Sequence, residues 1–181
     1  PLLCGGTSEY DNGNGSLMRI LPFIFYLNVN YGNDFWHDEA AVEAIHNVSA
    51  LTHAHQRSQI ACEIYLSVAQ MLIGGISLDI AVSLGIYKAW KYYDNKSEFS
   101  VELKYFERLH QKDLKNLLES QIKSSGYVVD TLEAAIWCLL NTNSYKDCVL
   151  KAVNLGADTD TVAAVVGGLA GMYYGVDAIP V

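Results

Sequence analysis

Hydrophobic residues recur at intervals of three and four along most of this chain, which is the spacing of one buried face of an α-helix. Ile136, Leu139 and Leu140 form one such set, and Val149, Ala152 and Val153 form another. No segment between these sets shows the strict alternation of a half-buried strand. The pattern therefore predicts an all-α domain, with helices at residues 16–30, 38–54, 57–73, 77–93, 97–109, 113–120, 130–141, 144–155 and 159–174.

Polar residues that favour helix N-termini stand at several of the predicted starts. The candidate caps are Ser77 with Asp79, Ser100 with Glu102, and Asn143 or Ser144. Charge is densest at residues 92–113, where we expect a solvated helix face, with a specific partner site as the alternative.

Composition narrows the class of protein. The chain has 181 residues, of which 51% are hydrophobic, so it can bury a substantial core as a single domain spanning residues 1–181. Its formal net charge is −8, and no basic run occurs in it. Because a phosphate backbone is recognised by clustered positive charge, nucleic acid is not expected to be the main partner.

The sequence also bears on compartment. The longest apolar run, residues 162–174, is interrupted by glycines and is short for a membrane span, and no signal-peptide pattern is present. Four cysteines lie far apart in the sequence and form no C-x-x-C pair; they are Cys4, Cys62, Cys138 and Cys148. We expect buried thiols in a reducing compartment, and hence a soluble cytoplasmic protein without membrane contacts.

A polar cluster, "DTDT", immediately precedes the apolar C-terminal helix. In a regular helix Asp158 and Asp160 would project about 200° apart, so a shared cation requires the bend of a loop entering a helix. Gly156 can provide that bend. Two carboxylates and the Thr161 hydroxyl are oxygen ligands, which suit magnesium, manganese or calcium better than zinc. The alternative is a doubled helix cap with solvated acids.

Glycines recur every four residues in the helix that follows the cluster, at Gly167, Gly171 and Gly175. One face of this helix therefore lacks side chains, and we expect another helix to approach it closely. Such packing would hold the acidic cluster on a rigid element.

A second polar stretch, "DNGNGS", covers residues 11–16 ahead of the first predicted helix. Its glycines permit backbone conformations in which successive amides point at one anion, so the loop could cradle a diphosphate. The alternative is an ordinary Asn-Gly turn with Ser16 as the helix cap.

Two further segments carry candidate binding residues. His53 and His55 are two residues apart and would face opposite sides of a helix, which argues against joint metal ligation and leaves one of them to bind a hydroxyl. Gly126 and Tyr127 open the helix predicted near residue 130, and Tyr127 either presents its ring to a base or ribose or belongs to the core.

Taken in order, four stretches resemble the ADP-ribosylglycohydrolase family, which includes the dinitrogenase-reductase-activating glycohydrolase. They are "GNGSLMRILP", "LTHAHQRS", "SGYVVDTLEAAIWCLL" and "AVNLGADTDTVAAVVGGLAGMYYG". The resemblance implies a compact multi-helix domain that holds two Mg²⁺ or Mn²⁺ ions. It also implies an activity that removes ADP-ribose from modified protein side chains or related conjugates.

Individual residues match the motifs of this family. By resemblance, the metal ligands are Asp158, Asp160 and Thr161. The resemblance assigns the substrate, ADP-ribose or an ADP-ribosylated protein, to Asp11, Asn12, Gly13, Asn14, Gly15, Ser16, His53, Gly126 and Tyr127. No catalytic residue is identified.

The chain departs from the family pattern in one respect. Members carry an N-terminal stretch with a Thr-Asp-Asp metal motif and a catalytic acid, and no T-D-D run occurs in this sequence. Three side chains cannot fill the coordination of two hard cations. We therefore expect the C-terminal part of the family domain, without its N-terminal helices and inactive by itself. The alternative is a non-catalytic ADP-ribose-binding or structural, crystallin-like member.

Overall fold

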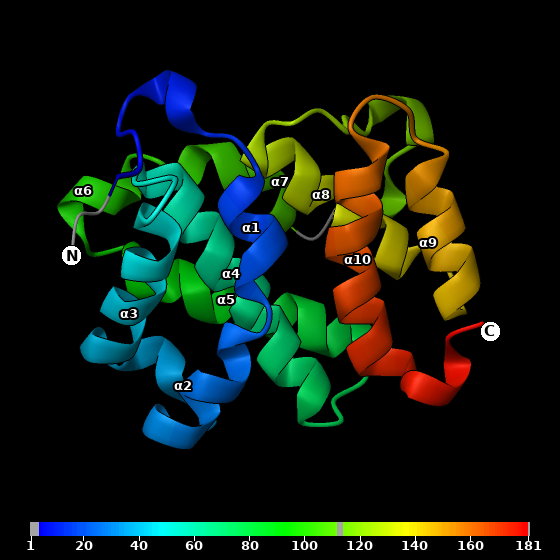
Figure 1. The fold of residues 1–181 in the computed structure, drawn as a ribbon, viewed down its shortest axis with the longest axis horizontal. Helices are drawn as coiled ribbons and strands as arrows, with labels where there is room; N and C mark the ends of the chain where they lie inside the picture. The colour runs from blue at the N-terminus through cyan, green and yellow to red at the C-terminus, as the bar shows by residue number, and fades with distance from the viewer. Residues whose placement is uncertain (1–3, 112–113, 181) are drawn as a thin grey trace.

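The computed structural model describes residues 4–111 and 114–180, and its helices are arranged around a central helix, α4 (Gln56–Ile73) (Figure 1). Every residue of α4 from Ile60 to Leu72 is buried. A helix without an exposed face must be covered on all sides, and α4 packs against α1, α3, α5, α8 and α10. The apolar character of this one helix thus determines the centre of the core.

The other helices surround α4. They are α1 (Gly15–Ile20), α2 (Phe23–Tyr31), α3 (Glu39–Ala50), α5 (Leu78–Tyr93), α6 (Ser97–Ser100), α7 (Glu107–His110), α8 (Val128–Leu140), α9 (Tyr145–Val153) and α10 (Thr159–Tyr174). Short 3₁₀ turns, η1 to η6, connect them at Glu9–Asp11, Phe35–His37, Leu103–Phe106, Leu114–Asn116, Glu119–Gln121 and Val176–Ala178. Residues 4–111 and 114–180 contain two isolated β-bridges and no strand, so the all-α prediction is confirmed.

The predicted helix at residues 16–30 is two helices. Leu21 and Pro22 separate α1 from α2, because proline cannot donate to a helical hydrogen bond and its ring clashes with the preceding turn. The chain therefore changes direction here, and α2 runs along the lower edge of the molecule in Figure 1.

The predicted helices at residues 97–109 and 113–120 are wrong. The first is divided into α6, η3 and α7, and Ser100 ends α6 instead of starting a helix. Leu103, Phe106 and Leu109 are buried at intervals of three, the period of a 3₁₀ helix. Of the second, Asp113 lies outside the described residues, and the rest forms only η4 and η5.

Two of the predicted helix starts have contrasting caps. Ser144 accepts a hydrogen bond at 3.0 Å from the backbone N–H of Asp147 and caps α9. Ser77 occupies the N-cap position of α5 without a side-chain hydrogen bond to the helix.

The glycines of α10 differ in how closely they approach their neighbours. A Cβ added at Gly167 or Gly171 would make ordinary contacts with Tyr145, at 3.5 and 3.8 Å. A Cβ at Gly168 would lie 2.9 Å from the Tyr65 hydroxyl and closer still to Leu21. Gly167 and Gly171 therefore face α9, as the prediction of a helix against this surface expected, but the tightest approach in α10 occurs at Gly168 and no atom lies within 4 Å of a Cβ added at Gly175.

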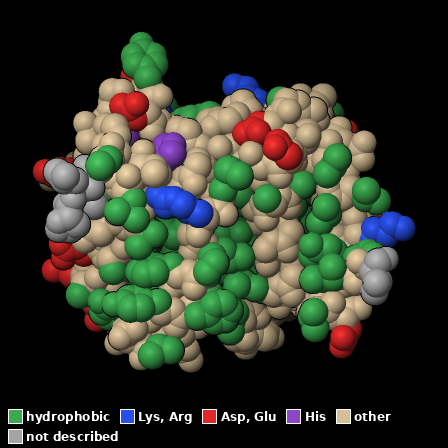
Figure 2. All heavy atoms as spheres, in the orientation of Figure 1, with side chains coloured by type: hydrophobic (Ala, Val, Ile, Leu, Met, Phe, Trp, Pro, Cys, Tyr) green, Lys and Arg blue, Asp and Glu red, His purple; other side chains and the backbone are tan. Residues whose placement is uncertain are grey.

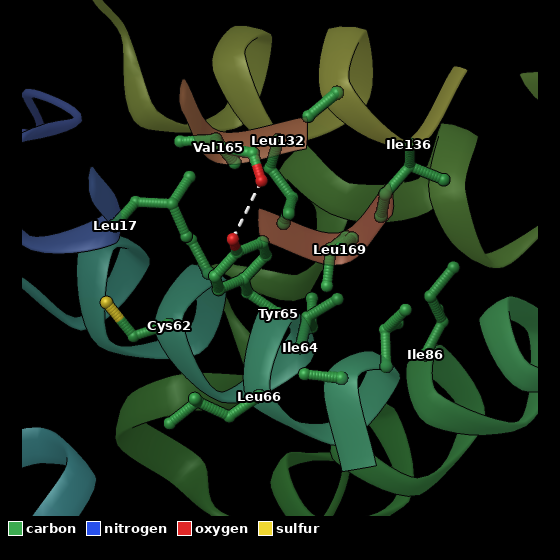
Figure 3. Close-up of a cluster of buried hydrophobic side chains, with 14 of the residues drawn as sticks. Leu17, Cys62, Ile64, Tyr65, Leu66, Ile86, Leu132, Ile136, Val165 and Leu169 are labelled. Atoms are coloured by element: carbon green, nitrogen blue, oxygen red, sulfur yellow. Dashed lines mark hydrogen bonds between the residues drawn. The ribbon is translucent and has the colours of Figure 1, made fainter. Parts of the chain in front are cut away.

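Tyr65 explains why the close approach occurs at Gly168. Its hydroxyl donates a 2.7 Å hydrogen bond to the backbone oxygen of Val165 in α10 (Figure 3). Because Gly168 carries no side chain, the Tyr65 hydroxyl has room beside α10 to reach that carbonyl. Gly168 thus lets α4 and α10 pack with a buried hydroxyl between them.

Three of the four cysteines are buried, as expected, but Cys4 is exposed. Among residues 4–111 and 114–180, no helix has both the length and the hydropathy that crossing a bilayer requires.

Candidate functional site

Three segments that are distant in sequence meet above the N-terminus of α10. The backbone N–H of Asn14 donates to the oxygen of Gly126 at 3.0 Å, and that of Val128 donates to the oxygen of Asn12 at 2.9 Å. The N–H of Asp158 donates to the oxygen of Ser124 at 2.9 Å. Backbone hydrogen bonds therefore join the loop at residues 11–16, the entry to α8 and the acidic cluster into one unit.

A side-chain network connects the same three segments. The Asn14 amide donates to Asp158 Oδ2 at 2.6 Å and to Thr131 Oγ1 at 2.9 Å. Thr161 Oγ1 donates to Asp158 Oδ1 at 2.9 Å. The hydrogen bond from Asn14 is the largest cause that lowers the pKa of Asp158, so this carboxylate is ionised at neutral pH. We call Asn14, Thr131, Asp158 and Thr161 the site network.

The backbone bends immediately before α10, where the sequence predicted a loop entering a helix. Gly156 has a φ of 87° and Ala157 a φ of 55°, both in the left-handed region. Asp158 occupies the N-cap position, but its carboxylate makes no capping hydrogen bond to the first turn. The doubled-cap alternative is therefore wrong for Asp158, whose oxygens accept from Asn14 and Thr161.

The acidic cluster suits a hard divalent cation chemically, because the side chains of Asp158, Asp160 and Thr161 all carry oxygen atoms. Asp160 lies exposed in the first turn of α10, and Thr161 is buried beside Asp158. Within the described part of the chain, no group of three or more His, Cys, Asp or Glu side chains is placed to hold a metal ion. The start of α10 therefore presents three oxygen-bearing side chains, fewer than the ligands that a hard cation takes.

His53 lies against the glycine loop. A Cβ at Gly15 would lie 2.8 Å from its Cε1 atom, and one at Gly13 would lie 3.1 Å from its Nε2 atom. Any larger residue at these two positions would displace the imidazole. Burial is the largest cause that lowers the pKa of His53, which favours the neutral ring.

The second histidine of the T-H-A-H stretch has a structural role. His55 is the N-cap of α4, and its Nδ1 accepts a hydrogen bond at 3.1 Å from the N–H of Arg57. Both histidines lie in the connection between α3 and α4 and not on the predicted helix, so the argument from opposite helix faces does not apply to them.

Three of the predicted binding side chains are used inside the protein. Asp11 accepts hydrogen bonds from the N–H and hydroxyl of Ser8. The Asn12 amide pairs with the Glu9 backbone and accepts from the Ser58 hydroxyl. Ser16 is fully buried and accepts from the Cys62 thiol at 3.5 Å. These three side chains therefore stabilise the conformation of the loop through hydrogen bonds within the protein.

A buried arginine beside Tyr127 has no counterpart in the sequence predictions. Arg57 is 4% exposed, donates to Glu102 at 2.7 Å and to the Tyr127 hydroxyl at 3.0 Å, and lies 3.6 Å above the Tyr105 ring. Glu102 belongs to the charge-dense segment that was expected to be solvated, so that expectation is wrong here. The sequence does not reveal this cluster, because Arg57 and Glu102 are 45 residues apart in the chain and only the fold brings them together.

These features define an all-α domain in which a glycine loop, a histidine and an oxygen-rich helix start converge on one side. A family model for ADP-ribosylglycohydrolase matches residues 2–181, and the chain belongs to that family.

Individual relatives agree with this assignment. ADP-ribosylarginine hydrolase Tri1 of Pseudomonas putida (strain GB-1) is 31% identical over 181 residues, covering 97% of this chain and 43% of that protein. ADP-ribosyl-[dinitrogen reductase] glycohydrolase of Rhodospirillum rubrum is 32% identical over 173 residues, covering 96% and 50%. A solved ADP-ribosylglycohydrolase-related protein complex superposes with a TM-score of 0.73 at 25% identity, covering 96% and 54%. The chain thus spans about half the length of the relatives it matches.

Proposed function

We propose that this chain provides the ADP-ribose-binding side of a metal-dependent hydrolase that removes ADP-ribose from ADP-ribosylated protein side chains. The observation that carries the proposal is the site network, in which one amide, Asn14, connects the glycine loop, α8 and the acidic start of α10. Relatives named as hydrolases of ADP-ribosylarginine and of ADP-ribosyl-[dinitrogen reductase] support the same substrate class.

The loop, Tyr127 and the start of α10 would each bind a different part of the substrate or its metal ion. Gly13 and Gly15 leave room for the His53 imidazole beside the loop, so the loop amides and His53 would together face a diphosphate. Tyr127, held by Arg57, offers a ring to the adenosine end. The negative charge of Asp158 and Asp160, with the hydroxyl of Thr161, would hold Mg²⁺ or Mn²⁺. When bound, such an ion orients ribose hydroxyls and activates water.

A second candidate is a member that binds ADP-ribose without hydrolysing it. Both Asp158 oxygens already accept hydrogen bonds, from Asn14 and Thr161, so the site network can support the loop without holding a metal ion. The same experiment separates the two candidates.

Calorimetry with ADP-ribose and Mn²⁺, together with hydrolysis assays on ADP-ribosyl-arginine and ADP-ribosyl-serine, tests the proposal. Asp158→Ala is expected to weaken ADP-ribose binding tenfold or more, which corresponds to about 1.4 kcal/mol. Asp177→Ala, at an exposed acid beyond the other end of α10, is the matched control. Equal binding by both variants would refute the site, and binding without turnover would favour the second candidate.

A further inference from the structure

The backbone of His53 is fixed on both sides. Its N–H donates to the oxygen of Ser49 at 2.8 Å, and its own oxygen accepts from the Ser49 hydroxyl at 2.9 Å. An isolated β-bridge joins the same residue to Gly6. The imidazole is therefore left with rotation about its side-chain bonds alone. Figure 2 shows histidine atoms at the surface near the start of α1, with a basic side chain over α1 close to them.

The two ring nitrogens of His53 have different neighbours. Nδ1 lies 2.8 Å from Thr52 Oγ1, and this contact fixes the orientation of the ring. Nε2, on the opposite side, lies against the glycine loop, where a Cβ added at Gly13 would be 3.1 Å away. The Thr52 hydroxyl therefore decides which atom of the imidazole faces the loop.

The Thr52 hydroxyl is in turn bound by a cation. Arg19 Nη2 donates to Thr52 Oγ1 at 2.7 Å. The same guanidinium donates to the backbone oxygens of Val48 and Ser49 at 2.9 and 3.3 Å. These carbonyls lie at the C-terminal end of α3, where the helix dipole stabilises a positive charge. Arg19 is thus anchored independently of Thr52.

These contacts determine where the protons lie. Arginine can only donate, so Arg19 occupies one lone pair of Thr52 Oγ1. A hydroxyl that accepts from a charged donor is itself a stronger donor, because hydrogen bonds in a chain polarise one another. The Thr52 proton is therefore directed at His53 Nδ1. A neutral imidazole whose Nδ1 accepts a hydrogen bond carries its own proton on Nε2.

The neighbours of His53 also favour the neutral ring. Burial lowers its pKa most, and the positive charge of Arg19 lowers it further, whereas the Asp11 carboxylate acts in the opposite direction. Because the pKa of a histidine is ordinarily about 6.5, a lowered value leaves the ring uncharged at pH 8.

We propose that Thr52 and Arg19 are positioning residues that hold His53 as the Nε2–H tautomer, with this N–H directed at an anionic oxygen on the glycine loop. The opposite tautomer would present a lone pair to the loop and repel such an oxygen. The tautomer rests only on hydrogen bonds within the protein. Its ligand, a diphosphate oxygen of ADP-ribose, rests on the proposed function.

Nitrogen-15 NMR of the imidazole at pH 8 tests the tautomer without a ligand. The parent chain is expected to show a single form of His53, with a protonated Nε2 and an unprotonated Nδ1. Thr52→Val keeps the shape of the side chain but removes its hydroxyl, so a mixture of tautomers is expected. Thr52→Ser should restore the parent spectrum. Thr142→Val, at a hydroxyl that donates to the oxygen of Cys138, is the matched control and should leave the His53 signals unchanged.

The role of Arg19 is tested in the same spectra. Arg19→Met removes the charged donor and keeps the Thr52 hydroxyl, so the Nε2–H form should lose population, although less than in Thr52→Val. Arg108→Met, at an arginine that donates to the oxygen of Gln121, is the control. A spectrum unchanged by Arg19→Met would contradict the positioning role of Arg19.

Calorimetry with ADP-ribose and Mn²⁺ tests the consequence for binding. Thr52→Val is expected to weaken binding about tenfold, because a directed hydrogen bond to a charged group is lost. Thr52→Ser and Thr142→Val should bind as the parent chain does. In a His53→Ala background Thr52→Val should cause no further loss, since a positioning residue acts only through the residue that it positions. Circular dichroism checks that the variants are folded.

Two further results would overturn the inference. One is a parent spectrum with the His53 proton on Nδ1. The other is an equal loss of affinity from Thr52→Val in the parent chain and in the His53→Ala background, which would make Thr52 a structural residue. A parent chain that shows the expected tautomer but binds no ADP-ribose would support the tautomer and contradict the proposed function, so the two failures are distinguishable.

Discussion

Two groups of buried polar side chains in this molecule differ in how their hydrogen bonds are satisfied. In the site network, each polar side chain has a partner from a segment distant in sequence or from the adjacent turn. Along α4, a second group, which we call the α4 polar stripe, consists of Glu63, Ser67 and Gln70. Neither Glu63 oxygen has a hydrogen-bond partner in good geometry among the described residues, although the nearby Tyr93 hydroxyl acts to lower the pKa of Glu63, and the Ser67 hydroxyl has no such partner either.

The contrast also appears in the ionisation of the two carboxylates. The Asn14 amide lowers the pKa of Asp158, whereas burial raises the pKa of Glu63 to about 8. Burial of a polar residue therefore does not by itself indicate a binding site. Convergence of complementary groups from different segments is the better criterion, because evolution of such a network requires several positions to agree.

The largest expected effect is at Asn14. Asn14→Ala removes the amide that donates to both Asp158 and Thr131, so Asp158 keeps only the hydrogen bond from Thr161 within the site network. Because one partner is charged, we expect the free energy of unfolding to fall by about 2–3 kcal/mol. Urea denaturation measures this. Asn154→Ala, whose exposed amide donates to the oxygen of Leu150, is the control and should cost under about 1 kcal/mol. Equal losses would show that the network contributes no more than a local bond.

Glu63→Gln should raise the free energy of unfolding, in contrast to Asn14→Ala. The raised pKa means that the folded state keeps a proton which the unfolded state releases above about pH 4.5. Stability from this group therefore falls as pH rises from about 4.5 to about 8. The variant carries no such proton, so we expect it to be more stable than the parent at pH 8 by about 2 kcal/mol, with a flatter profile.

The measurement is chemical denaturation at pH 7 and pH 8. His46 contributes little in this range, because burial lowers its pKa to about 4 in the folded state and the unfolded chain keeps most of it neutral above pH 7 as well. Glu98→Gln, at an exposed position, is the control and should leave the profile unchanged. A parent protein that gains stability between these two pH values would contradict the assignment to Glu63.

The smallest effect is expected from Tyr65→Phe. This variant keeps the ring in the core and removes only the hydrogen bond to the oxygen of Val165. The free energy of unfolding should fall by about 1 kcal/mol. Tyr87→Phe, at a hydroxyl-bearing ring that is 49% exposed, should change it by less than about 0.5 kcal/mol. Similar values for both would show that the contact at Gly168 does not depend on the hydroxyl.

Much of the helical structure could be predicted from periodicity. The helices α3, α4, α5, α8, α9 and α10 lie within a few residues of the predicted ranges, and α10 has the predicted ends. These helices have apolar positions three and four residues apart, so their burial and their local preference agree. The failures lie at residues 97–120, where a 3₁₀ period and short turns replace a regular repeat, and at residues 16–30, which Leu21 and Pro22 divide into two helices.

The amino-acid sequence by itself determined the all-α class and the bend before Asp158, together with the glycine loop at residues 13–15. Only the tertiary structure placed Arg57 against Glu102 and Tyr105, selected Gly168 for the close approach, and exposed the outer side of α2. The physical reason is that periodicity and turn chemistry act between near neighbours in sequence. Contacts across 45 or 100 residues depend on which helix surfaces meet, and that is decided by packing of the whole domain.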